Sequence, residues 1–135
     1  MKREIKFRAY SSHNHKMYPV SNIEWDIDGR IWVTADDGKN GIELIDEEAH
    51  LMQYTGLHDK NGREIYEGDI IVAHPKMKYE IPKIGVVQYG DYRPMFQYKL
   101  VDGEKYSIWN NDVNRTYEVI GNIFENPELL EGKHE

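Results

Sequence analysis

The chain of 135 residues contains no cysteine. This absence excludes disulfides, thiolate nucleophiles, iron–sulfur clusters and every zinc site that uses cysteine, and it suits a reducing cytosol. Long apolar runs are also missing, since the longest aliphatic stretch is Ile70-Ile71-Val72-Ala73 and a membrane-spanning helix needs about 20 apolar residues. The start, Met1 to Arg8, lacks the apolar region of a secretory signal. We therefore expect a cytoplasmic protein that does not enter a membrane.

Sequence motifs of the common enzyme classes are missing as well. Neither glycine-rich phosphate loop, Gly-x-Gly-x-x-Gly or Gly-x-x-x-x-Gly-Lys-Ser/Thr, occurs, and no Gly-x-Ser-x-Gly nucleophile elbow is present. Carboxylate pairs such as Asp36-Asp37 and Glu47-Glu48 lie in polar runs, where solvation leaves a carboxylate without catalytic activation. The sequence therefore predicts a protein that is not an enzyme and that uses no cofactor.

Charge is plentiful but unevenly distributed along the chain. The formal net charge is −7, which argues against a general binder of duplex DNA. Residues 1–23 carry five basic residues against one acidic residue, whereas residues 24–69 carry four against thirteen. Alternating blocks of opposite charge favour contacts within or between subunits, so we expect a homo-oligomer.

A hairpin is the strongest local signal in the chain. Two segments that alternate apolar and polar residues, 23–27 and 30–34, flank the dipeptide Asp28-Gly29. Asp-Gly suits a two-residue type I′ turn. Such a turn pairs Trp25 with Trp32 and places both indoles on one face of the hairpin.

The period-two pattern continues along most of the chain and predicts an all-β, mainly antiparallel fold. We expect an N-terminal hairpin-rich lobe over residues 1–55. A small SH3-like β-barrel lobe over 56–135 follows, because short strands with glycine-rich corners suit a strongly bent sheet. A short C-terminal helix is expected with Asn126 as its N-cap, Pro127 in its first position and Gly132 as its stop.

Three segments of the chain, residues 3–10, 52–70 and 117–130, are together similar to the YopX family of phage and prophage proteins. Their order and spacing match across nearly the full length, and the middle segment, Met52 to Ile70, is the most specific. The resemblance implies a protein made in a bacterial cytoplasm from phage-derived DNA. It implies no biochemical activity, cofactor or catalytic residue, and residues 71–116 carry the least similarity.

The distinctive middle segment has a structural interpretation. Three glycines recur every six residues and can supply positive φ angles or close backbone approaches between a hairpin lobe and a barrel. Aspartates can accept hydrogen bonds from local amides in the turn and at the start of the next strand, and Ile65 with its neighbouring tyrosine can fill the space between lobes. The residues of this structural motif are Gly56, Asp59, Gly62, Tyr66, Gly68 and Asp69.

One pair of histidines comes closest to the pattern of a metal site. His13 and His15 would point to the same side of a strand and could share a divalent ion with a third ligand from Asp26, His50 or His58. A polar loop with two exposed histidines explains the pattern better. We therefore predict no metal site and keep a histidine-based metal enzyme only as a residual hypothesis.

Basic and aromatic residues alternate between residues 76 and 99, and this stretch is the best functional candidate. Ordinary core packing, a protein interface and a surface for single-stranded nucleic acid all fit the pattern. We predict a phage-derived accessory protein, an interaction or assembly module that binds itself or an unknown phage or host protein. Binding of single-stranded nucleic acid is the alternative. The candidate residues are Lys76, Lys78, Lys83, Tyr89, Tyr92, Arg93, Phe96 and Tyr98.

Overall fold

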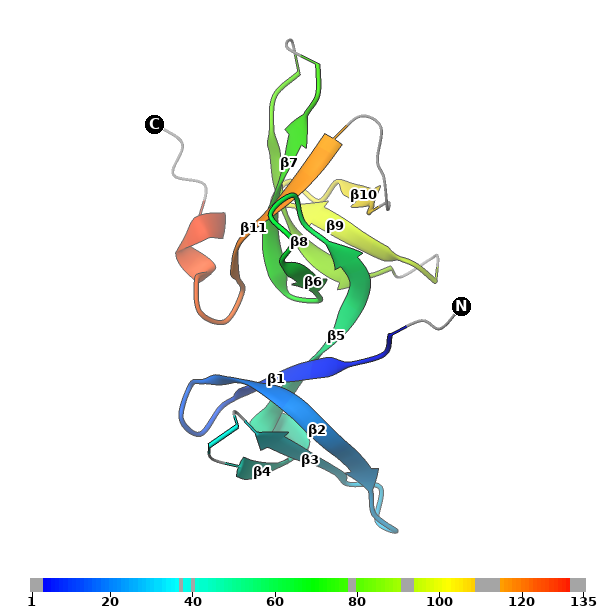
Figure 1. The fold of residues 1–135 in the computed structure, drawn as a ribbon, viewed down its shortest axis with the longest axis vertical. Helices are drawn as coiled ribbons and strands as arrows, with labels where there is room; N and C mark the ends of the chain where they lie inside the picture. Colours follow the sequence, from blue (N-terminus) through cyan, green and yellow to red (C-terminus); the bar gives the residue numbers. More distant parts are fainter. Residues whose placement is uncertain are drawn as a thin grey trace. The chain divides into compact units, whose positions relative to one another are not determined.

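The structure is a computed structural model that describes residues 4–36, 38–39, 41–77, 80–90, 94–108 and 115–131. The chain divides into two compact units, Met1–Tyr54 and Thr55–Glu135. Apart from two short 3-10 helices, the regular structure of the described residues is β-strand (Figure 1). The predicted all-β, mainly antiparallel fold is confirmed. None of the helices in the described ranges has the length and apolar character needed to cross a membrane.

The first unit is a curled antiparallel sheet with the strand order β4-β3-β2-β1-β5. Three strands separate β4 from β5 in this order, yet only the three-residue 3-10 helix η1 connects them in the chain. The sheet therefore curls until these two strands approach each other. The unit's small core lies inside the curl and contains the fully buried residues Ala9, Val33 and Leu44. Its elements are β1 (Phe7–Ser11), β2 (Met17–Trp25), β3 (Ile31–Asp36), β4 (Gly41–Ile45), η1 (Asp46–Glu48) and the first part of β5 (Ala49–His58). Residues 55–58 of β5 belong to the second unit.

The hairpin of β2 and β3 is present, but its predicted register is wrong by one residue. Trp25 lies opposite Ile31 rather than Trp32, so the two indoles are on opposite faces. The amide of Asp26 donates to the carbonyl of Arg30 at 3.0 Å, which leaves a three-residue loop. Gly29 ends this loop with φ 85°, a left-handed conformation that glycine adopts without strain. Three-residue loops of this kind compete with the type I′ turn in hairpins.

The second unit contains an antiparallel sheet with the order β10-β9-β8-β7-β11. Alternate residues of β7, β8, β9 and β11 point to one face and form its core, which Ile65 of β6 completes. The strand β6 is the hydrogen-bonded neighbour of β5, and the hydroxyl of Thr55 donates to the Ile65 carbonyl at 2.7 Å. The elements are β6 (Glu64–Tyr66), β7 (Asp69–Pro75), β8 (Lys83–Tyr89), β9 (Phe96–Leu100), β10 (Lys105–Ser107) and β11 (Arg115–Asn122).

The predicted SH3-like barrel requires a correction. Within the described residues β10 pairs only with β9, and no hydrogen-bonded ladder joins β10 to β11. The strand β10 has three residues, which is too short to close a five-stranded sheet onto its far edge. The second unit therefore contains an open five-stranded sheet, not a closed barrel.

The predicted C-terminal helix is present as one 3-10 turn, η2 (Pro127–Leu130), with Pro127 in its first position. Asn126 does not cap it with its side chain. Its Oδ1 instead accepts from the amide of Asn122 at 3.1 Å, which fastens the turn after β11. The predicted stop, Gly132, lies outside the described residues.

Candidate interaction sites

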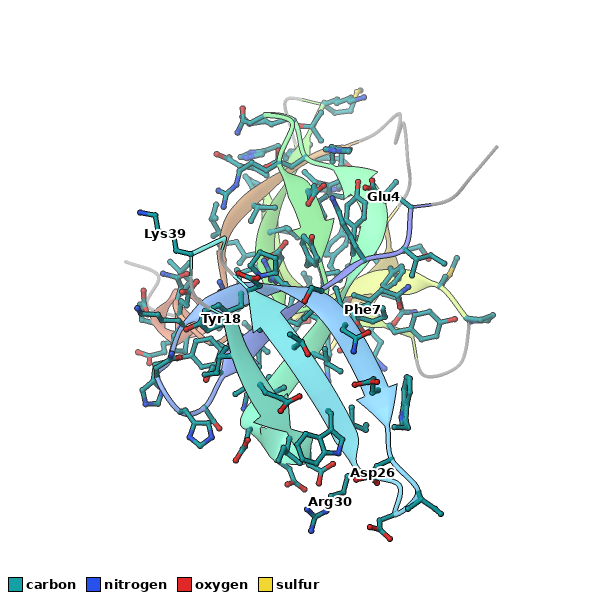
Figure 2. The ribbon with its side chains drawn as sticks, turned by 60° about the horizontal axis from the view of Figure 1, so that its bottom comes forward. Glu4, Phe7, Tyr18, Asp26, Arg30 and Lys39 are labelled. Carbon is teal, nitrogen blue, oxygen red and sulfur yellow. The ribbon has the colours of Figure 1, made fainter. Side chains whose placement is uncertain are left out.

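The end of the β2–β3 hairpin is held by a single carboxylate. Asp26 Oδ1 accepts from the amides of Asp28 at 2.9 Å and Arg30 at 3.0 Å, and its Oδ2 accepts from the Trp32 indole Nε1 at 2.9 Å. Figure 2 shows Asp26 and Arg30 at this end of the hairpin. The hydrogen bond from the Trp32 indole, followed by those from the backbone, holds the pKa of the Asp26 carboxyl below its usual value. The turn is thus fixed before any partner binds.

Two large apolar side chains stand in solvent on this fixed turn. Trp25 is 68% exposed and Ile27 is 100% exposed. We call residues Trp25 to Arg30 the hairpin tip. Exposed aromatic and aliphatic groups on a rigid support lose little conformational freedom when they bind, and tryptophan is enriched among the residues that dominate interface energies. The hairpin tip therefore has the character of a protein-binding surface.

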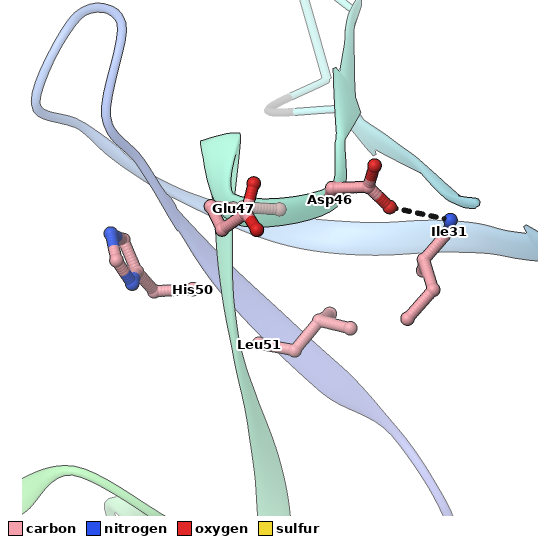
Figure 3. A pocket seen from close by; sticks show the side chains of 6 residues that line it. Ile31, Asp46, Glu47, His50 and Leu51 are labelled. Carbon is pink, nitrogen blue, oxygen red and sulfur yellow. Dashed lines mark hydrogen bonds between the residues drawn. The ribbon is translucent and has the colours of Figure 1, made fainter. Parts of the chain in front are cut away.

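The first unit also contains a pocket with a volume of about 420 Å³. This volume is within the range of about 300–1,000 Å³ that is usual for ligand sites. Figure 3 shows Asp46 and Glu47 on η1 in the upper part of the view and the side chains of Ile31, Leu51 and His50 below them. The lining residues are Ile31, Asp46, Glu47, Ala49, His50 and Leu51.

The turn above the pocket is fastened by two of its own carboxylates. Asp46 has a positive φ of 51° and accepts from the Ile31 amide at 2.9 Å, which ties η1 to the start of β3. Aspartate tolerates this left-handed conformation better than most residues. Glu48 Oε1 accepts from the Ile45 amide at 2.9 Å, and this bond is the main reason that the pKa of Glu48 is lowered.

The histidines considered as metal ligands do not form a metal site in the described part of the chain. His13 and His15 lie in the loop between β1 and β2, not on a strand, and His15 has a positive φ of 58°. His13 Nε2 instead lies 3.0 Å from Glu48 Oε2. Among the described residues no three histidine, aspartate or glutamate side chains come together to hold an ion. Asp26 belongs to the hairpin tip, and His58 lies in the second unit.

The basic and aromatic residues of 76–99 are only partly arranged as a surface. Lys83 Nζ lies 5.0 Å from the centroid of the Tyr106 ring, a cation–π contact. Tyr89 is 47% exposed and meets Phe96 edge-on, with their centroids 5.3 Å apart. Lys76 is exposed just after β7. Lys78, Tyr92 and Arg93 lie outside the described residues.

Tyr98 does not belong to a surface. It is 2% exposed and lies in the core of the second unit, between Tyr106 at 5.5 Å and Tyr117 at 5.8 Å between ring centroids. Its position on β9 explains the difference, because alternate residues of a strand point to opposite faces and Tyr98 has the inward parity. This tyrosine contributes to folding, not to recognition.

The motif between residues 56 and 69 has a structural role in the second unit. The buried Asp59 accepts from the amides of Asn61, Arg63 and Val119, each at 2.9 Å. Burial opposes ionisation, but the three amides outweigh it and hold the pKa of the Asp59 carboxyl below its usual value. The Tyr66 amide donates to Asp69 Oδ2 at 2.8 Å. The glycines Gly56, Gly62 and Gly68 all have positive φ angles.

Sequence reasoning missed both sites of the first unit. The sequence pattern pairs Trp25 with Trp32 on one face of the hairpin and gives no indication of a pocket. The available signal for the pocket was the acidic tripeptide Asp46-Glu47-Glu48 between two strands, which is short enough to force β4 and β5 together.

Comparison with known proteins gives matches over nearly the whole chain. The family model described as YopX protein matches residues 6–131. The crystal structure of protein EF1440 from Enterococcus faecalis has 29% sequence identity and a TM-score of 0.61, over 96% of this chain and 100% of that one. The structure of yopX from Bacillus subtilis has 21% identity and a TM-score of 0.64, over 93% and 98%. A search of curated proteins finds no match.

Proposed function

The chain belongs to the YopX family, and we propose that it is a non-enzymatic interaction module that docks on a partner protein through its hairpin tip. The resemblance predicted from three sequence segments is confirmed by the family match over residues 6–131. As the family resemblance implies, we also propose that the protein is encoded by phage-derived DNA and acts in the cytoplasm of a bacterium. The observation that carries it is the exposure of Trp25 and Ile27 on the turn that Asp26 holds.

The energetics of such a contact favour the tip over other exposed residues. Truncation of a central tryptophan in an interface typically costs about 2 kcal/mol or more, which corresponds to roughly a 30-fold loss of affinity. The turn loses little conformational entropy when a partner binds, because three hydrogen bonds to Asp26 already fix its conformation. The partner in the first instance is a second copy of this chain, as the opposed charge blocks favour, and otherwise a phage or host protein.

Sedimentation of the purified protein over a wide concentration range tests self-association. The variant Trp25→Ser/Ile27→Ser removes the apolar tip, and Val101→Ser is the matched control, since Val101 is 67% exposed in the second unit. We expect a concentration-dependent mass for the wild type and for the control, and a monomer for the tip variant.

If the wild type is monomeric, a photo-crosslinking residue at position 27, with position 101 as the control, identifies another partner in the bacterial host. Crosslinks at position 27 that do not exceed those at position 101 would overturn the proposal. A fluorescence titration with single-stranded DNA and RNA measures the alternative function, with Lys83→Glu and Tyr89→Ala alongside. Binding that weakens steeply with salt and fails in both variants would favour nucleic acid instead.

A further inference from the structure

The pocket of the first unit combines an apolar floor with an acidic rim. Ile31, Ala49 and Leu51 supply the floor and pack against the unit's hydrophobic core. Asp46 and Glu47 of η1 supply the rim (Figure 3). A site built in this way suits a ligand that has an apolar stem and a polar, positively charged end.

The walls of the pocket are held by the fold of the first unit. Its lining comes from the first residue of β3, from η1 and from the start of β5. The bond from the Ile31 amide to Asp46 at 2.9 Å fixes the rim to β3. A preformed pocket loses less free energy to ordering on binding than a flexible one.

The charge around the pocket has one predominant sign. Its six lining residues include two carboxylates, no lysine or arginine, and His50 as the one basic side chain. Glu48 is the next residue of η1, and its Oε2 lies 3.0 Å from His13 Nε2. The Glu48 carboxylate therefore already has a partner within the protein. Glu47 is exposed to solvent at the rim. An anionic ligand would be repelled, whereas a cationic group could donate charge-assisted hydrogen bonds to the rim carboxylates.

We propose that this pocket binds an arginine side chain of a partner protein. The methylene stem of the arginine lies on Ile31, Ala49 and Leu51, and its guanidinium group reaches the carboxylates of Asp46 and Glu47. Arginine fits better than lysine, because a planar guanidinium can donate to two carboxylate oxygens at once and is less strongly hydrated than an ammonium group. The site is separate from the hairpin tip, so this inference goes beyond the proposed function and does not depend on it.

An amide-resolved NMR titration of the full chain tests the proposal. The probe is N-acetyl-arginine amide, and N-acetyl-citrulline amide is its uncharged isostere. We expect the arginine compound to shift the amide signals of Ile31 and of residues 46–51 in a saturable manner. The citrulline compound is expected to leave these signals in place at the same concentration.

Two matched variants locate the charge that matters. Glu47→Gln removes one rim charge, and we expect about two- to fivefold weaker binding, the range for an exposed ion pair. Glu43→Gln removes the same charge from an exposed position on β4 that does not line the pocket, and we expect unchanged binding. The spectra themselves show that each variant is folded.

Three results would overturn the inference. The signals of residues 46–51 could remain unchanged at saturating arginine amide, or they could respond equally to citrulline amide. Glu43→Gln could also weaken binding as much as Glu47→Gln, which would indicate general attraction to an acidic surface. The variant Ile27→Ser changes the hairpin tip without touching Trp25, the cross-strand partner of the lining residue Ile31. It should leave this titration unchanged, so failure of the pocket and failure of the hairpin tip are separate outcomes.

Discussion

Replacing Asp59 with alanine should destabilise the second unit more than any exposed turn substitution. The carboxylate is 7% exposed and accepts from three backbone amides, of which the bond from Val119 is buried. A buried donor left without a partner costs about 1–3 kcal/mol, and the two amides in the turn lose bonds to a charged acceptor. Because water can replace part of the turn bonds, we expect a total loss of about 2–4 kcal/mol for Asp59→Ala.

Urea unfolding followed by circular dichroism measures this loss, with Asp102→Ala as the control. Asp102 accepts from the Glu104 amide at 2.9 Å in an exposed turn of the same unit, so its replacement should stay within about 0.5 kcal/mol of the wild type. Hydrogen exchange at the Val119 amide should accelerate in Asp59→Ala and stay slow in the control. A loss under about 0.5 kcal/mol for Asp59→Ala would refute the reasoning.

The same carboxylate gives the stability a defined pH dependence. The pKa of Asp59 is lowered from its ordinary value of 3.8 in the folded protein. A carboxyl with a lowered folded pKa stabilises the fold above its unfolded pKa and loses that contribution as the pH falls through the folded pKa. The stability difference between wild type and Asp59→Ala should therefore be constant near neutral pH and shrink below about pH 4. A difference that persists at lower pH would show that the charge is not responsible.

Further substitutions test the turn and strand geometry. Asp26→Ala removes the acceptor of the Trp32 indole, so the indole proton signal should move and amide exchange at residues 27–30 should accelerate in NMR spectra. Gly29 has φ 85° with open space around it, so Gly29→Ala should cost about 1–2 kcal/mol in urea unfolding and Gly29→Asn less, because asparagine tolerates the left-handed region. At Gly85 an added Cβ would lie 2.9 Å from the backbone oxygen of Lys99, so Gly85→Ala should lower the thermal midpoint through a loss of about 1–3 kcal/mol.

The positions of the strands could be predicted from the sequence, because the alternation of apolar and polar residues is a local pattern. Closure of a sheet into a barrel depends on contacts between distant strands and could not be predicted in this way. Once the strands are known, alternation along them predicts that Gly85, Val87 and Tyr98 face the core. The open sheet of the second unit depends instead on how far β10 extends, and its three residues carry no distinctive signal. Glycine-rich corners permit a barrel without requiring one.

Surface assignments were less predictable than core assignments for a related reason. A tyrosine in a basic stretch fits a binding surface and a buried core equally well, because its ring is apolar and its hydroxyl is polar. Strand parity places Tyr98 and Tyr89 on the same face of the sheet, because Val87 lies opposite Tyr98 and two residues before Tyr89. The position along the strand then decides, since Tyr98 in the middle of β9 is buried whereas Tyr89 at the end of β8 is 47% exposed. The pocket depends on a contact between distant parts of the sequence, since Ile31 at the start of β3 lies beside Asp46 of η1, and a local pattern does not reveal such a contact.

The register of the β2–β3 hairpin depends on more than the Asp-Gly dipeptide. Residues 26–30 and 59–63 share the pattern Asp-x-Asp/Asn-Gly-Arg and form the same turn. In both, the first Asp Oδ1 accepts from the amides two and four residues later, its own amide donates to the arginine carbonyl, and the glycine φ is 85°. The Asp-Gly dipeptide alone favours a two-residue loop, but the aspartate that precedes the glycine by three residues lengthens the loop by one.

The two turns differ in the donor that binds the second carboxylate oxygen, Oδ2, of the first aspartate. In the second unit Asp59 Oδ2 accepts from the buried Val119 amide, so the turn is fastened to β11 and stabilises the fold. In the first unit Asp26 Oδ2 accepts from the Trp32 side chain of the same hairpin, so the turn is rigid but remains in solvent with Ile27 at its end. One five-residue pattern therefore provides a structural anchor in one unit and a candidate contact surface in the other.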